Sequence, residues 1–325
     1  MERHRMTDPT HRWLEHYPVT LFTIVMGMAG LTLALRAGEQ ALGLTSALSA
    51  AVYVVTLALF GVIAAGYGAK ALRHPAALRA EWDHPVKLAF FPAISIGLLL
   101  LAAATMPWSE PVARAMWLIG AALQGVLTLA VVSGWIGSRA FLHGHLSPAW
   151  FIPAVGNVIV PIAGVDLGYV ELSWFFMSVG LIFWLILLTL VMNRLVFHDP
   201  LPERLQPTLV ILIAPPAAGF LAWVKLTGGI DHLAHILLNG GYFFGLIVAV
   251  QLPRILRLPF AMSFWALSFP VAALTIASLQ YAEVTGSTAH HLIGLGLLLA
   301  LTVTLGALLI RTFRAVSSGA VFQLE

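Results

Sequence analysis

Histidine and lysine are the residues in this sequence whose spacing could support metal or covalent chemistry. His232 and His235 stand at the i, i+3 spacing at which two ligands share one helix face. Other histidines are also close in sequence: His143 with His145, and His290 with His291. No third ligand, HExxH motif or cysteine accompanies them. Lys225 could form a Schiff base, but it lies near the end of its hydrophobic run. We therefore expect no metal site, no cofactor and no enzymatic activity.

Phe269 is a candidate of a different kind, because it directly precedes Pro270 inside a long hydrophobic run. An interior proline bends a helix, and side chains next to the bend can point toward the concave side. A bulky ring placed there would close a narrow pore. The alternative is that Phe269 packs against another helix or against lipid, as an arbitrary membrane phenylalanine does. Both interpretations are open from these residues alone.

The composition is that of a protein embedded in lipid. Hydrophobic residues make up 60% of the 325 and charged residues only 10%, against about 25% charged in a soluble domain. A bilayer is the simplest environment in which so much apolar surface is satisfied. The net charge of +3 lies in short connections between hydrophobic runs. It therefore indicates membrane topology and not a nucleic-acid partner.

Ten hydrophobic runs are long enough to cross a bilayer, which takes roughly 20 apolar residues. They cover residues 18–36, 41–69, 86–108, 113–138, 148–166, 171–195, 206–226, 232–252, 259–282 and 287–311. Acidic residues precede the first run, unlike in a signal peptide, so we expect it to be retained as the first span. The sequence thus predicts an all-α polytopic membrane protein, with residues 1–325 forming a single transmembrane domain.

Lysine and arginine are distributed unequally between the two ends of these spans. Of the 17 such residues, 14 fall on one side, and only Arg36, Arg114 and Lys225 fall on the other. Cytoplasmic loops carry the excess of these cations. We expect both termini in the cytoplasm and the protein in the inner membrane of a bacterium.

A proline marks the start of each odd-numbered span, so the chain repeats a helical hairpin five times. These prolines are Pro18, Pro85, Pro148, Pro207 and Pro259, which makes each repeat 52 to 67 residues long. Proline suits the first turn of a helix, where its missing N–H would be unpaired anyway. The pattern predicts five hairpins in a quasi-fivefold arrangement.

Further prolines lie deep inside four of the five odd spans, whereas the even spans have none at their centres. They are Pro92, Pro153, Pro161, Pro215, Pro216 and Pro270. In a membrane, a proline-broken helix persists where protein or a water-lined cavity satisfies its backbone. We expect the odd spans to form an inner pore ring lined by Pro92, Pro161, Pro215 and Pro270, with straighter even helices outside. The alternative is that these prolines are packing kinks with no pore between them.

The centres of the spans carry no Asp, Glu, Lys or Arg. Ionisable residues inside a membrane usually mark proton relays and ion-coupling sites, so their absence weighs against a coupled pump. An anion would then be stabilised by backbone dipoles at the kinks. Arg254 and Arg257 could raise the anion concentration at the cytoplasmic mouth. Alternatively, they only set the topology.

Two segments resemble a known superfamily that includes TehA tellurite-resistance proteins, slow-type plant anion channels and yeast malate permeases. The first is YPVTLFTIVMGMAGLTLA, starting at Tyr17, and the second is FAMSFWALSFPVAALTIASLQYAE, starting at Phe260. The resemblance extends from about residue 11 to residue 315. It implies a homotrimer with a separate pore in each protomer, closed by the phenylalanine of W-x-x-x-F-P, which is Phe269 here. It also implies that Phe22 and Gly27 lie near the pore.

The sequence therefore predicts a passive channel for small anions such as chloride or nitrate, gated by Phe269. The alternative is a coupled transporter of C4-dicarboxylates or tellurite, which would need a titratable group in its path. The expected partners are these small anions or dicarboxylates, membrane lipid and further copies of the chain.

Overall fold

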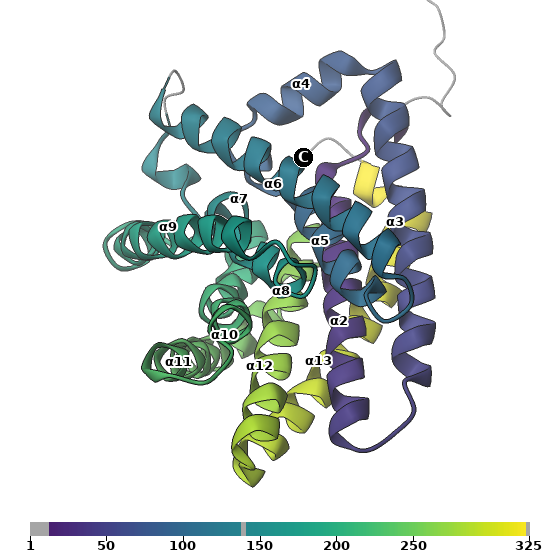
Figure 1. The fold of residues 1–325 in the computed structure, drawn as a ribbon. Helices are drawn as coiled ribbons and strands as arrows, with labels where there is room; N and C mark the ends of the chain where they lie inside the picture. The colour runs from purple at the N-terminus through teal and green to yellow at the C-terminus, as the bar shows by residue number, and fades with distance from the viewer. Residues whose placement is uncertain (1–12, 138–140, 323–325) are drawn as a thin grey trace, which may run out of the picture.

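The computed structural model describes residues 13–137 and 141–322, which are helical and contain no strand (Figure 1). Nine helical segments in these ranges are long and apolar enough to cross a membrane. Four are odd spans, each a 3₁₀-helix followed by an α-helix: η1 (Val19–Leu21) and α2 (Phe22–Ala41), η2 (Lys87–Phe90) and α5 (Ala93–Thr105), η6 (Glu203–Ile213) and α10 (Ala214–Thr227), and η7 (Met262–Leu267) and α12 (Phe269–Thr285). The others are the five even spans: α3 (Ala47–Arg73), α6 (Glu110–Ile136), α9 (Val170–Phe197), α11 (His232–Ile255) and α13 (Thr288–Ser317).

The remaining span, expected at 148–166, is shorter and interrupted. It is the apolar stretch Pro148–Gly164, which consists of four pieces: η4 (Pro148–Trp150), α7 (Phe151–Val155), η5 (Gly156–Ile159) and α8 (Val160–Gly164). Its two interior prolines, Pro153 and Pro161, cannot donate backbone hydrogen bonds, so a regular α-helix cannot run through the stretch without a break.

Side chains of the outer helix α6 bind the backbone carbonyls of this interrupted span. Thr128 Oγ1 donates to the Pro153 carbonyl over 2.8 Å, and Gln124 Nε2 donates to the same oxygen over 3.3 Å. Further along, Trp117 Nε1 donates to the Val160 carbonyl over 2.9 Å. An unpaired carbonyl in a membrane interior is costly. These three bonds explain how the broken backbone is tolerated.

Burial separates the odd spans from the even spans. In the four long odd spans, 78–83% of the residues in the most apolar window are buried, whereas in the even spans the share is 17–33%. The odd spans also contact one another in turn: α2 meets α5 and α12, α12 meets α10, α10 meets α8, and α8 meets α5. Figure 1 shows these helices in the middle of the molecule, with α3, α9 and α11 toward its periphery.

The interior prolines lie where the 3₁₀-helices of the odd spans give way to α-helices. Pro92 is the N-cap of α5, and Pro215 and Pro270 lie in the first turns of α10 and α12. A proline in the first helical turn lacks only an N–H that has no partner within that helix. The prolines therefore start new α-helices in the middle of the molecule, where sequence patterning predicted bends.

A buried ion pair fixes the connection between the first two hairpins. Lys70, near the end of α3, and Glu81, in the short helix α4 (Pro75–Asp83), are separated by 2.7 Å between Nζ and Oε2. Glu81 also accepts hydrogen bonds from the Val19 N–H, over 2.8 Å, and from the Tyr67 hydroxyl, over 3.0 Å. Lys70 also donates to the Tyr17 carbonyl. The pair thus holds the beginning of the first span in place.

Candidate functional site

A cavity lies where the five odd spans meet. Its volume is about 70 Å³, room for on the order of five water molecules. All described residues that line it belong to odd spans: Thr23 and Met26 of α2; Phe90 and Ile96 around Pro92; Phe151, Ile152, Val155, Gly156, Val158 and Ile159 of the interrupted span; Ile211, Ala214, Pro215 and Ala218 around the start of α10; and Met262, Ser263, Trp265, Ala266, Ser268, Phe269 and Pro270 around the start of α12.

None of these lining side chains is ionisable. The only hydroxyls among them belong to Thr23, Ser263 and Ser268, and each donates to a backbone carbonyl. The Trp265 indole N–H is directed to Thr312 Oγ1 of α13, over 2.9 Å. The walls therefore offer an ion an almost entirely apolar surface, with no fixed charge to hold it.

The α-helices of three odd spans begin at the level of the cavity. α10 begins with Ala214 and Pro215, and α12 begins with Phe269 and Pro270, and all four residues line it. α5 begins at Ala93, between the lining residues Phe90 and Ile96. A helix N-terminus carries about half a positive charge. At these starts, N–H groups already donate to the preceding 3₁₀ turns, from Ala214 to the Ile211 carbonyl and from Ser268 to the Trp265 carbonyl, so the backbone offers the cavity only a part of that charge.

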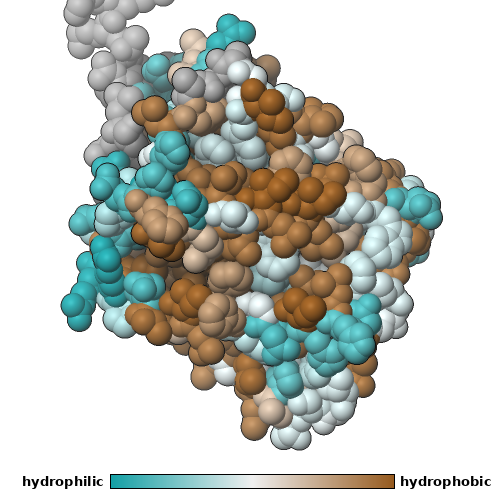
Figure 2. Space-filling model, turned by 90° about the vertical axis from the view of Figure 1, so that its left-hand side faces the viewer, coloured by the Kyte–Doolittle hydropathy of each residue, from teal (hydrophilic) through white to brown (hydrophobic). Residues whose placement is uncertain are grey.

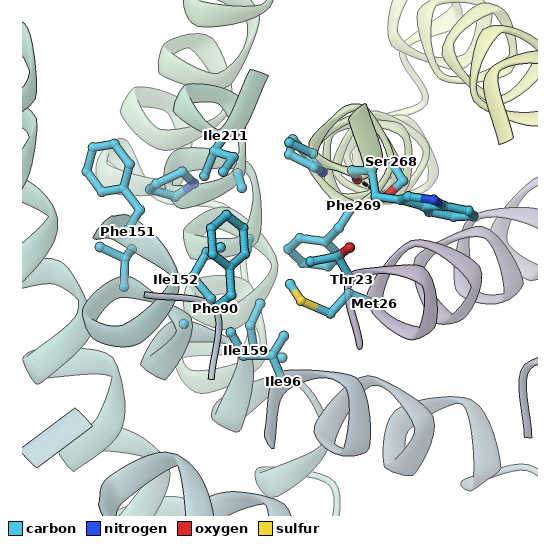
Figure 3. A pocket seen from close by; sticks show the side chains of 18 of the residues that line it. Thr23, Met26, Phe90, Ile96, Phe151, Ile152, Ile159, Ile211, Ser268 and Phe269 are labelled. Carbon is cyan, nitrogen blue, oxygen red and sulfur yellow. Dashed lines mark hydrogen bonds between the residues drawn. The ribbon is translucent and has the colours of Figure 1, made fainter. Parts of the chain in front are cut away.

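Two phenylalanine rings face each other across this space. Figure 3 shows Phe269 and Phe90 pointing toward the middle of the cavity from different spans, with Thr23 and Met26 beside Phe269. Phe269 is 8% exposed and Phe90 is 5% exposed. The sequence selected Phe269 as a candidate because it precedes an interior proline. It did not select Phe90, although Phe90 lies only two residues before Pro92. The next residue, Phe91, packs its ring against Trp82 at 4.8 Å, away from the cavity.

The other residues that the sequence predicted to lie at the pore differ in their position relative to the cavity. Pro215 and Pro270 line the cavity, whereas Pro92 and Pro161 are buried behind its lining. The Phe22 ring packs outward, 5.6 Å from the ring of Tyr67 in α3.

Gly27 contacts the chain next to Phe269. A Cβ placed on Gly27 would lie only 2.4 Å from Ser268 Oγ. Gly27 therefore allows α2 to approach the start of α12, although it does not itself line the cavity.

Arg254 and Arg257 lie outside this cavity. Both are exposed, Arg254 in the last turn of the outer helix α11 and Arg257 two residues after its end. Histidines of two of the sequence pairs also lie outside the cavity: the ring centroids of His235 and His290 are 5.6 Å and 4.2 Å from that of Tyr281. In the described part of the chain, no group of three or more His, Cys, Asp or Glu residues could hold a metal ion.

The helices and the cavity define an integral membrane protein with an uncharged central cavity between buried, proline-broken spans. Residues 16–313 match the family described as voltage-dependent anion channel, and the chain belongs to this family. Its membership confirms the resemblance seen in the sequence.

Three relatives show how far the similarity extends. The chain is 27% identical to the S-type anion channel SLAH3 of Arabidopsis thaliana over 312 residues, which cover 94% of this chain and 49% of the plant protein. It is 25% identical to an uncharacterized transporter of Methanocaldococcus jannaschii, over 96% of this chain and 98% of the relative. It is 26% identical to the tellurite resistance protein TehA homolog of Haemophilus influenzae, over 79% of each. The chain thus spans about half the length of the plant relative.

Proposed function

We propose that the protein is a passive, anion-selective channel for small anions such as chloride or nitrate. The single observation that carries this proposal is the cavity lined by all five odd spans and by no ionisable side chain. A coupled carrier needs a group that binds the coupling ion or proton, and this lining provides none. An uncharged path that binds weakly suits conduction, because an ion must leave as readily as it enters.

The proposed architecture has ten membrane crossings in five quasi-symmetric hairpins. The interrupted stretch Pro148–Gly164 supplies the tenth crossing, because it contributes to the cavity wall as the other odd spans do. An even number of crossings is consistent with both termini in the cytoplasm, as the distribution of lysine and arginine indicates. The assembly proposed from family resemblance is a homotrimer in a bacterial inner membrane, with one pore in each protomer.

Phe269 is the proposed gate. Its ring and that of Phe90 point into the apolar central cavity, where an anion would lose its hydration shell. Moving an ion from water into an apolar medium costs several kcal/mol or more. Rotation or removal of the ring would widen the passage and admit water.

The N-termini of α5, α10 and α12 would then favour anions over cations. Arg254, in the last turn of α11, and Arg257, just after it, would add only to the field at the cytoplasmic end.

Anion flux through purified protein in liposomes tests this function. Wild type and Phe269→Ala should be reconstituted separately under the same conditions. The reversal potential of each should then be measured across chloride, nitrate, malate and tellurite gradients. We expect Phe269→Ala to raise anion current on the order of tenfold or more, because a hydrophobic constriction has been removed. Unchanged current from a correctly assembled Phe269→Ala protein would refute the gate assignment.

The rival function is a coupled transporter of dicarboxylates or tellurite. The name of the Haemophilus influenzae relative, a tellurite resistance protein, makes this the alternative to test. Proton movement in fixed proportion to malate or tellurite uptake in the same vesicles would support the transporter and contradict the passive channel.

A further inference from the structure

A second cavity lies on the outside of the odd-span ring, between α9, α11 and η6. Its volume is about 350 Å³, within the range of small-molecule sites. Its apolar lining comprises Met192, Leu195, Pro200, Leu201, Leu209, Leu212, Phe244, Ile247, Val248 and Ile255, and its polar lining comprises His198, Gln206, Gln251 and Arg254. None of these residues lines the central cavity, so the two spaces are separate sites.

The helices on either side of this outer cavity present apolar surface to the surroundings. Val196 and Phe197 of α9 are 62% and 75% exposed, and Leu246 and Val250 of α11 are 68% and 77% exposed. Figure 2 views the side of the molecule that carries α9 and α11, and it shows a broad brown, hydrophobic area flanked by teal, hydrophilic residues. In a membrane protein such a surface contacts lipid tails. The outer cavity therefore lies between helices that contact lipid tails.

The polar end of the outer cavity is positively charged. Arg254 is exposed in the last turn of α11 and has no ion-pair partner within residues 13–137 and 141–322. No Asp or Glu is among the residues that line the cavity. Gln251 lies three residues earlier on the same helix, so its amide and the guanidinium occupy one face. Guanidinium groups bind phosphate oxygens through charge-assisted hydrogen bonds.

The outer cavity shares a wall with the central cavity. Gln206, Leu209 and Leu212 of η6 line the outer cavity, whereas Ile211 of the same helix lines the central one. η6 is a 3₁₀-helix of 11 residues, and runs longer than about four residues are uncommon and often mark hinges. A ligand in the outer cavity would therefore contact a segment that is able to change its helical geometry.

We propose that the outer cavity binds an anionic phospholipid of the surrounding bilayer. Arg254 binds the phosphate, Gln251 and His198 contribute hydrogen bonds at the head group, and one acyl chain occupies the apolar part between Leu195, Leu209 and Val248. The apolar lining matches a hydrocarbon chain, and the unpaired guanidinium matches a phosphodiester. The bound lipid stabilises one geometry of η6 and so acts on the wall of the central cavity. The action of the lipid on the central cavity rests on the proposed channel function.

Native mass spectrometry of the delipidated protein tests the site. The protein should be titrated with phosphatidylglycerol and, separately, with zwitterionic phosphatidylcholine of the same acyl chains. We expect wild type to bind phosphatidylglycerol more tightly, and Arg254→Gln to weaken that binding about tenfold, as loss of a hydrogen-bonded charge would do. Arg257→Gln is the matched control, because it removes the same charge three residues away and outside the cavity.

A second variant tests the cavity itself. Gln251→Trp places a large side chain in the outer cavity from an exposed position on α11, so it should block lipid binding without disturbing the helix packing. Equal weakening by Arg254→Gln and Arg257→Gln would show general electrostatic attraction and overturn the site. Equal binding of the two lipids, or unchanged binding in Gln251→Trp, would also overturn it.

Flux measurements separate the lipid site from its effect on the channel. Wild-type anion flux should differ between vesicles of pure phosphatidylcholine and vesicles with added phosphatidylglycerol, and Arg254→Gln should remove that difference. Identical wild-type flux in both, with lipid binding intact, would refute the action through η6. Absence of anion flux under all conditions would count against the proposed function but not against the lipid site.

Discussion

Gly30 of α2 lies directly against Phe269 of α12. A Cβ on Gly30 would be 3.0 Å from the Ala272 Cβ, 3.4 Å from Phe269 Cδ2 and 3.7 Å from Phe269 Cα. The backbone that carries the proposed gate is thus packed against α2 at a position where only glycine avoids crowding. A side chain larger than hydrogen at residue 30 would therefore press on both Ala272 and the Phe269 ring.

Gly30→Ala should destabilise the protein by about 1 kcal/mol, because overpacking a close helix contact costs about 1–3 kcal/mol and the helix propensity of alanine offsets part of that. The thermal unfolding midpoint in detergent measures the effect. Gly61→Ala in α3 is the control, since a Cβ there meets nothing within 4 Å. That variant should be neutral or slightly stabilising. Equal midpoint shifts in the two variants would contradict the crowding at Gly30.

Phe90 should matter for conduction and Phe91 should not. Phe90 lines the central cavity opposite Phe269, whereas Phe91 packs against Trp82 in α4. Phe90→Ala should therefore raise anion flux in the direction of Phe269→Ala, on the order of several-fold, because it widens the same constriction. Phe91→Ala serves as the control and should leave flux per folded protein unchanged. If Phe91→Ala raised flux as much as Phe90→Ala, general loosening of the structure would explain both results.

The sequence could identify which spans are buried but not the detailed course of each. Prolines at matching positions of successive hairpins are visible in the sequence, and Pro215 and Pro270 do lie at the central cavity. The choice between Phe90 and Phe91 depends on helical phase. In a 3₁₀-helix successive side chains are about 120° apart, against about 100° in an α-helix, so the two geometries diverge by about 20° with each residue of η2.

The interrupted span shows a second limit of sequence patterning. Pro153 and Pro161 indicated kinks, but nothing in the sequence linked them to Thr128 and Gln124 of α6, which bind the Pro153 carbonyl. Those donors come from another hairpin, so only the tertiary structure pairs them with the broken backbone. The run expected at 148–166 as one kinked span is a series of short helices.

Breaking the Lys70–Glu81 ion pair should strongly destabilise the protein. The two side chains are 4% and 6% exposed, and removing one partner of a buried pair costs about 3–5 kcal/mol because the other charge remains unpaired. Lys70→Met should therefore lower the free energy of unfolding by about that amount. The double variant Lys70→Met/Glu81→Gln should recover part of it, since no buried charge remains. Unfolding by denaturant with a double-mutant cycle measures the coupling.

The exposed pair Lys225–Asp166 is a matched control for this prediction. Its N–O distance is also 2.7 Å, but its side chains are 38% and 43% exposed. Lys225→Met should cost only about 0–1 kcal/mol, because water already solvates both charges. A Lys225→Met effect as large as that of Lys70→Met would show that burial does not determine the cost of losing either pair.

Asp231 should make the stability of the α11 N-terminus depend on pH. It is the N-cap of α11 and accepts hydrogen bonds from the Ala234 N–H and the Trp223 indole, each over 2.9 Å. The backbone bond from Ala234, with a smaller contribution from Trp223, lowers the pKa of this carboxyl. Because the folded-state pKa lies below the unfolded value of about 3.9, the ionised carboxylate stabilises the folded state at neutral pH. That stabilisation is lost as the pH falls below about 4 and through the folded-state pKa.

Asp231→Asn isolates this effect, since asparagine is a comparable N-cap that does not titrate. At neutral pH the wild type should have the higher thermal unfolding midpoint in detergent, and the difference between the two proteins should disappear in strong acid, where both carry a neutral cap. Trp223→Phe keeps the aromatic ring but removes the indole donor. In the Trp223→Phe background, the difference in unfolding midpoint between the proteins with and without Asp231→Asn at neutral pH should therefore be smaller, but not zero. A difference between wild type and Asp231→Asn that stayed constant across the acid range would show that the charge of Asp231 does not contribute, and the cap would then act through its hydrogen bond alone.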